Sequence, residues 1–109
     1  MSLPNFEYCS PKSIEQAIAL RQEYGDDALV MSGGLTAMIL LRERLVKPRV
    51  VISLSEIPVL QRIDFSEQAL RIGAAVTHSK VASSTQVRNV APILCEACWH
   101  VGSPAIRIM

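Results

Sequence analysis

The stretch that decides the fold is Val30-Met31-Ser32-Gly33-Gly34-Leu35-Thr36-Ala37-Met38. The apolar run Ala28–Met31 leads into it and is typical of a strand buried on both faces of a sheet. The apolar residues that follow, with charges gathered at residues 42–47, predict a helix from about Thr36 to Leu45 that Pro48 ends. A buried strand, a glycine pair and a helix start together predict an anion-binding turn. Glycine has no Cβ to block a ligand, and the first N–H groups of a helix point at it.

The segments on either side extend this pattern into an alternation of strands and helices. Phe6–Tyr8 alternates like a short strand, and Ser13 with Gln16 has the spacing of a helix capping box. The helix that Ser13 opens is predicted to end at Gly25. Val50–Leu54 is a further apolar run, typical of another buried strand. The order strand, helix, strand, helix, strand predicts a small α/β layer with a mostly parallel sheet.

The pattern changes after residue 55. Residues 60–65 and 69–73 alternate around a polar turn at residues 66–68, which predicts a β-hairpin. Thr77 is placed to cap a short helix through Ala82, and residues 87–101 predict a helix with a break or first turn at Pro92. Ile106–Met109 is expected to begin a strand. We therefore expect an α/β subdomain at residues 1–55 and an incomplete second subdomain of hairpin and helices at residues 56–109, an α+β arrangement overall.

Composition and charge narrow the classes of function. The 109 residues are 50% hydrophobic with a net charge of +1, which suits one globular domain. This near-neutral charge gives no electrostatic footprint for nucleic acid, and no apolar run is long enough to span a membrane. The three cysteines are an odd number, which argues against a disulfide framework. Residues 1–5 show no signal-peptide pattern, so a cytoplasmic location is expected.

Residues 30–38 resemble the first glycine loop of the FAD-binding subunit or domain of the molybdenum hydroxylases, the family of xanthine dehydrogenase and carbon monoxide dehydrogenase. Further segments resemble the family in the same order, so the resemblance covers essentially the whole chain as the N-terminal portion of that unit. These segments are Phe6–Tyr8 with Pro11, Ile14–Ala17, Pro48–Leu54 with Ile57 and Leu60, Ile72–Thr77, Pro92–Leu94 and Gly102–Arg107. The resemblance implies an FAD-binding fold of the PCMH type.

The same resemblance implies a cofactor and a binding site, but no catalytic side chain. FAD is expected as the cofactor, with its diphosphate on the turn made by Met31, Ser32, Gly33, Gly34, Leu35, Thr36 and Ala37. The chain would then be the electron-transfer component of an oxidoreductase, passing electrons from iron–sulfur clusters to FAD and on to an acceptor. Leu35 stands where the family commonly has a polar residue, whereas Thr36 keeps a hydroxyl.

The family pattern also implies partners and a further loop. Molybdopterin is expected on a large subunit and the [2Fe–2S] clusters on a small subunit, not on this chain. The family's second glycine loop would begin just after Arg107, where this sequence reads Ile108-Met109. We therefore expect the 109 residues alone to bind FAD weakly.

Cys95 and Cys98 form a C-x-x-C pair beside His100, which raises a metal or redox interpretation. A zinc site needs four ligands, usually from a second pair that this sequence lacks. A thioredoxin-like pair stands at the start of a helix, whereas this pair lies late in one. Structural cysteines are therefore favoured, and no metal site is predicted.

Two other functions stay open at the level of the sequence. A truncated, flavin-free α/β module would have only a structural or interaction role. A nucleotide-binding module of another family would use the same Gly33-Gly34 turn to hold a mononucleotide. The absorbance spectrum of bound flavin separates FAD binding from the flavin-free module.

Overall fold

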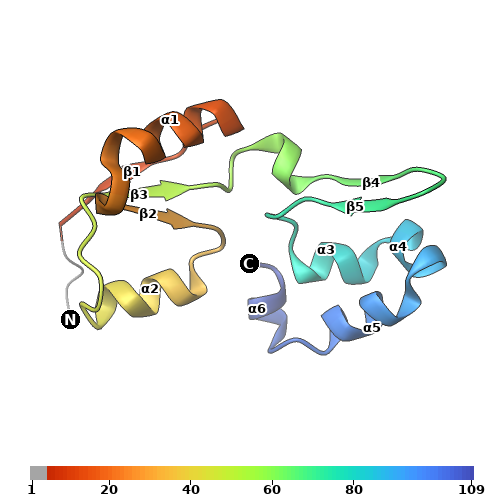
Figure 1. The fold of residues 1–109 in the computed structure, drawn as a ribbon. Coiled ribbons are helices and arrows are strands. Elements are labelled where there is room, and N and C mark those ends of the chain that lie inside the picture. The colour runs from red at the N-terminus through yellow and green to blue at the C-terminus, as the bar shows by residue number, and fades with distance from the viewer. Residues whose placement is uncertain (1–4) are drawn as a thin grey trace. The chain divides into compact units, whose positions relative to one another are not determined.

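A computed structural model of the chain describes residues 5–109. Residues 1–4, on which the expectation of no signal peptide largely rests, lie outside the described residues. The chain divides into two compact units, Met1–Val59 and Leu60–Met109, called here the first and second units (Figure 1). The assignment of residues 1–55 and 56–109 to two FAD-binding subdomains stays a prediction.

A parallel sheet organises the first unit. Its strands are β1 (Glu7–Cys9), β2 (Ala28–Met31) and β3 (Val50–Ser53), and their order across the sheet is β1-β3-β2. The predicted β-α-β-α-β order and parallel sheet are confirmed. The central strand β3 is buried along its whole length. The prediction that β2 is buried on both faces is wrong, because β2 is an edge strand and its Val30 is 44% exposed.

The helix α1 (Ile14–Tyr24) begins as its sequence predicts. The Ser13 hydroxyl accepts a hydrogen bond from the Gln16 N–H at 3.2 Å. The Gln16 side chain reaches back to the Lys12 N–H at 2.9 Å, one residue before the cap. Gly25, with a φ of 56°, ends the helix and begins the short 3-10 turn η1 (Gly25–Asp27). Figure 1 shows α1 on one face of the sheet and α2 (Leu35–Arg42) on the other.

The helix α2 stops at Arg42, three residues before the predicted end, and Pro48 does not end it. Arg44 takes a left-handed conformation with a φ of 55°. The Leu45 N–H then bonds to the Leu40 carbonyl at 3.0 Å and the Arg44 N–H to the Leu41 carbonyl at 3.2 Å. This pair of bonds is a Schellman motif, which closes a helix by satisfying its last carbonyl groups.

The second unit begins with a hairpin. Its strands β4 (Ile63–Phe65) and β5 (Leu70–Ile72) pair antiparallel, which confirms the predicted hairpin. The first strand starts later than residue 60, because the chain forms the 3-10 helix η2 (Pro58–Gln61) as it enters this unit. The helix α3 (His78–Ser83) follows, and the Thr77 hydroxyl caps it by accepting from the Lys80 N–H at 3.1 Å, as predicted.

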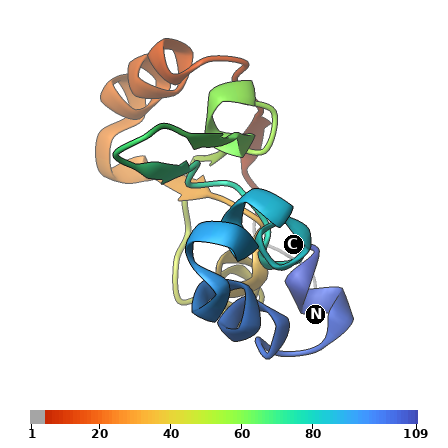
Figure 2. The same ribbon diagram turned by 90° about the vertical axis from the view of Figure 1, so that its right-hand side faces the viewer.

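Three more helices complete the second unit: α4 (Thr85–Val90), α5 (Pro92–Trp99) and α6 (Pro104–Arg107) (Figure 2). The break predicted at Pro92 is confirmed, because this residue begins α5. The strand expected from Ile106 is wrong. The Ser103 hydroxyl accepts from the Ile106 N–H at 3.4 Å and Pro104 occupies the first turn, two features that start a helix.

The core of the second unit lies among α3, α4 and α5. Its buried residues are Val81, Ala82, Val87, Cys95 and Cys98. Apolar side chains of the hairpin, including Ile63 and Ile72, pack against this cluster. Across residues 5–109, no helix is long and apolar enough to cross a membrane.

Candidate functional site

The glycine pair forms the connection from β2 to α2. Gly33 has a φ of 77°, and Gly34 has a φ of 88° and a ψ of 2°. Residues other than glycine reach this left-handed region only at a cost in free energy. Gly34 is the N-cap residue of α2, and its carbonyl accepts from the Met38 N–H at 2.8 Å. The N–H groups at residues 35–37 precede this first helical bond and have no partner within the helix.

Gly34 is glycine for a second reason, which is close packing. It is buried, and a Cβ built on it would lie 3.1 Å from the sulfur of Met31. The Met31 thioether therefore lies directly against the Gly34 Cα, and a larger residue would press on it. Backbone conformation and close contact together explain why this turn contains glycine.

A cavity of about 280 Å³ opens at the glycine turn. Its lining comes from the end of β2, the turn and the first turns of α2: Leu29, Val30, Met31, Ser32, Gly34, Leu35, Thr36, Ala37 and Leu40. Among the residues predicted to bind the cofactor, only Gly33 is missing from this lining. The structure thus brings the other predicted residues to one concave surface at a helix N-terminus, a setting that attracts anions.

The turn after β3 lies next to the glycine turn. Met31 is in register with Ser53, and the Leu54 N–H donates to the Met31 carbonyl at 2.9 Å. The Ser53 side chain is buried, and its hydroxyl is 3.0 Å from the Ser55 hydroxyl. The carboxyl ends of β2 and β3 therefore form one continuous edge, where open α/β sheets bind their ligands.

A charged group stands at the same edge of the sheet. The Glu56 carboxylate accepts from the Ser10 hydroxyl at 2.6 Å and from the Lys12 ammonium at 2.9 Å. These two hydrogen bonds and the charge of Lys12 lower the pKa of Glu56 below its ordinary value. Sequence reasoning missed this group because Glu56 is more than 40 residues from Ser10 and Lys12. The ends of β1 and β3 meet only because the two strands are parallel neighbours in the sheet.

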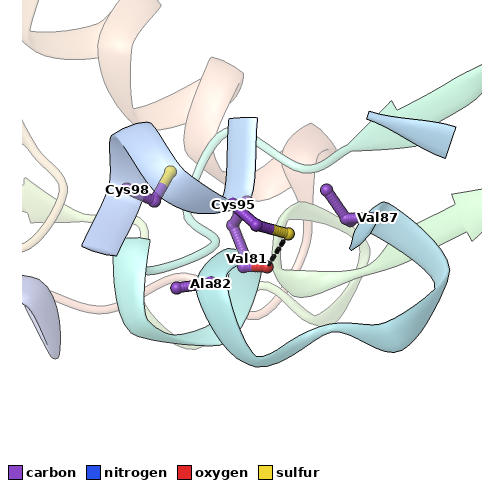
Figure 3. Close-up of a cluster of buried hydrophobic side chains, with 5 residues drawn as sticks. All are labelled: Val81, Ala82, Val87, Cys95 and Cys98. Atoms are coloured by element: carbon purple, nitrogen blue, oxygen red, sulfur yellow. Dashed lines mark hydrogen bonds between the residues drawn. The ribbon is translucent and has the colours of Figure 1, made fainter. Parts of the chain in front are cut away.

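The cysteine pair is part of the core of the second unit (Figure 3). Cys95 and Cys98 are buried on α5, and the Cys95 thiol donates to the Val81 carbonyl at 3.4 Å. Burial, reinforced by the neighbouring Cys95, raises the pKa of the Cys98 thiol. A raised pKa keeps a thiol protonated and slow to react. Within residues 5–109, no three His, Cys, Asp or Glu side chains gather as metal ligands would.

The other chemically interesting side chains of the second unit lie at its surface. His78 is exposed at the start of α3, and His100 is exposed just after α5. The Arg107 guanidinium lies 5.3 Å from the ring centre of Trp99 and donates to the Val101 carbonyl at 3.3 Å. Its contacts are therefore an aromatic face and backbone carbonyl groups of its own unit.

A parallel α/β layer with a glycine turn at the carboxyl end of a strand defines a class of nucleotide-binding proteins. The chain belongs to the family described as the FAD binding domain in molybdopterin dehydrogenase, whose model matches residues 4–109. This family membership confirms the resemblance inferred from the sequence.

Relatives and solved structures agree with this family. The 6-hydroxypseudooxynicotine dehydrogenase complex subunit alpha of Paenarthrobacter nicotinovorans is 35% identical over 98% of this chain and 36% of that protein. The solved carbon monoxide dehydrogenase from Hydrogenophaga pseudoflava that lacks the Mo-pyranopterin moiety matches with a TM-score of 0.94 and 33% identity, over 98% of this chain and 37% of that chain. Quinoline 2-oxidoreductase from Pseudomonas putida 86 gives a TM-score of 0.92 and 33% identity, with the same coverage. The chain thus spans a little over a third of the length of these proteins.

Proposed function

We propose that this chain binds FAD as part of the flavin component of a molybdenum hydroxylase-type dehydrogenase. FAD, when bound, supplies the redox chemistry that links iron–sulfur clusters to an electron acceptor. In this proposal the molybdopterin and the [2Fe–2S] clusters belong to a large and a small partner subunit. Membership of an FAD-binding family supports the cofactor, and relatives named as subunits of dehydrogenase complexes support the setting. The complex is proposed to be cytoplasmic, and the free thiols of Cys9, Cys95 and Cys98 agree with a reducing compartment.

The turn between β2 and α2 carries the proposal. The backbone N–H groups of Leu35, Thr36 and Ala37 are proposed to donate to the diphosphate oxygens, helped by the positive end of the α2 dipole. The exposed Thr36 hydroxyl adds another donor at the cavity. The role proposed for Gly34 is to hold the left-handed turn that presents these N–H groups, because a Cβ there would strain the backbone and press on the Met31 sulfur.

The size of the cavity sets an expectation for affinity. Pockets that enclose drug-sized ligands measure roughly 300–1,000 Å³. The cavity at the turn, about 280 Å³, lies just below that range and suits a diphosphate better than a whole flavin dinucleotide. Ordering a long, flexible ligand also costs free energy that one anion contact does not offset. We therefore expect the 109-residue chain to bind FAD with a Kd no tighter than micromolar.

The test compares two glycines that both have positive φ. Gly34→Ala places a methyl group at the turn, whereas Gly25→Ala strains the backbone at φ 56° with no atom within 4 Å of the new Cβ. Titration with FAD, followed by flavin fluorescence, should show at least tenfold weaker binding for Gly34→Ala and wild-type binding for Gly25→Ala. Thermal unfolding checks that both variants fold.

Other outcomes would contradict the proposal or its expected affinity. Equal FAD affinity of Gly34→Ala and the wild type would exclude the turn as the diphosphate site. Submicromolar, stoichiometric binding by the wild-type chain would show that the site is more complete than the glycine turn alone. A wild-type chain that binds no FAD at millimolar concentration would favour the flavin-free module.

A further inference from the structure

The connections of the first unit diverge to opposite faces of the sheet beyond the end of its central strand. After β1 the chain turns to α1 on one face of the sheet, and after β2 it turns to α2 on the opposite face (Figure 1). β3 lies between these two strands, so the turn at residues 53–56 stands where the two connections diverge. In open α/β sheets, ligands bind beyond the carboxyl ends of the strands, at the point where the connections diverge in this way. Glu56 therefore stands at the binding edge, on the far side of β3 from the glycine turn.

The Glu56 carboxylate is held by one of its oxygens. Both the Ser10 hydroxyl and the Lys12 ammonium bond to Oε2, and the Glu56 side chain is 50% exposed. The same contacts lower its pKa, so the carboxylate, which is ionised at neutral pH in any case, stays ionised to lower pH. The carboxylate is thus held by two residues that follow β1, and it is half open to solvent. A fixed, ionised carboxylate accepts hydrogen bonds from hydroxyl groups and repels phosphates.

The spacing of the strands relates this carboxylate to the glycine turn. Neighbouring strands are about 4.8 Å apart, so the ends of β1 and β2, with β3 between them, are separated by about 10 Å. A nucleotide whose diphosphate lies at Gly34 would extend its ribose over a distance of this order. We propose that Glu56 accepts hydrogen bonds from the ribose hydroxyl groups of the adenosine half of the dinucleotide. This inference rests on the proposed function, because it requires the diphosphate at the glycine turn.

ADP is the probe, because it carries the diphosphate and the ribose without the flavin. Isothermal titration compares ADP with 2′,3′-dideoxy-ADP, which lacks both ribose hydroxyl groups. A hydrogen bond to an ionised group is strong, so the wild type should prefer ADP on the order of tenfold. Glu56→Gln should lose this preference and bind both nucleotides equally weakly. Glu43→Gln, which changes an exposed carboxylate at the end of α2, should keep it.

The remaining outcomes separate this inference from the proposed function. Wild-type discrimination that persists in Glu56→Gln would overturn the ribose assignment. A wild-type protein that binds both nucleotides equally would also overturn the ribose assignment. A Glu56→Gln variant that weakens FMN binding but leaves ADP binding unchanged would overturn it too. Should ADP binding be insensitive to Gly34→Ala, the proposed function itself fails. The absence of any ADP binding at millimolar concentration would contradict both the ribose assignment and the proposed function. If the Lys12–Glu56 salt bridge had only a structural role, Glu56→Gln would shift the unfolding midpoint without changing the preference for ADP.

Discussion

The two units of the chain use similar residue types for different purposes. In the first unit, the strands of a parallel sheet end together, and Gly34 begins α2 with a left-handed turn at that edge. In the second unit, Gly73 packs under a neighbouring backbone segment, and the cysteines fill a small core. A glycine or a cysteine therefore indicates function only through its place in the fold. Three further experiments test this contrast.

The largest effect is expected at Gly73. A Cβ built there would lie 2.2 Å from the Leu60 carbonyl oxygen, and that oxygen also accepts from the Ala75 N–H at 2.8 Å. Backbone would have to move, so Gly73→Ala should destabilise the second unit by about 3 kcal/mol or more. Trp99, the single tryptophan, reports on this unit in urea unfolding followed by fluorescence.

The matched control for Gly73→Ala is Ala74→Ser, at an exposed neighbouring position. This control should change stability by less than about 0.5 kcal/mol. A Gly73→Ala variant that unfolds at the wild-type urea concentration would show that the close approach to Leu60 is not required. The contrast between Gly73, required for packing, and Gly34, proposed to hold the diphosphate-binding turn, would then fail.

A smaller effect is expected for the cysteine pair. Cys95→Ala with Cys98→Ala should cost about 1 kcal/mol at each site, because buried sulfur contacts are lost. FAD affinity should stay unchanged, because both side chains lie in the core of the second unit. Iodoacetamide at pH 8 should modify the half-buried Cys9 before Cys98, since burial raises the pKa of Cys98. Loss of FAD binding, or of bound zinc or iron, in the double variant would contradict the structural role.

The smallest effect is expected at the end of α2, and it is stabilising. Arg44 occupies the left-handed position of the Schellman motif with a φ of 55°, where glycine is favoured. Arg44→Gly should stabilise the first unit by about 1 kcal/mol, more than an exposed arginine gains from surface contacts. Arg42→Gly, at the last residue of the helix, should instead destabilise it by up to about 1 kcal/mol. Thermal unfolding followed by circular dichroism in the tyrosine region compares the two, and equal midpoints would contradict the prediction.

Local chemistry explains why much of the fold was predictable. Ser13 and Thr77 satisfy the first N–H groups of their helices, and Pro92 starts a helix where the sequence placed a break. The glycine turn was predictable for the same reason, because an apolar strand, two glycines and a helix start follow one another directly in the chain. Each of these signals depends on residues within about five positions of one another.

The incorrect predictions have two other causes. Some elements depend on residues that are distant in the sequence, and others on a competing local signal. Ala28–Met31 suits a doubly buried strand, but its position at the edge of the sheet leaves Val30 exposed. The charges after Arg42 predict the end of a longer helix, whereas the left-handed turn at Arg44 closes it earlier. At Ile106 the apolar pattern suggested a strand, and the cap at Ser103 outweighed it.

The sequence by itself determined the order of the elements in the first unit, the glycine turn and the family, because these depend on residue types at short, fixed spacings. The tertiary structure decided what lies beside that turn. Hydrogen bonding between parallel strands places Ser53 in register with Met31, and the Ser10 and Lys12 side chains bond to Glu56 across the sheet edge. No local pattern encodes such neighbours, since they follow from which strand lies at the centre of the sheet. The carboxylate at the same sheet edge as the glycine turn is therefore a property of the folded chain.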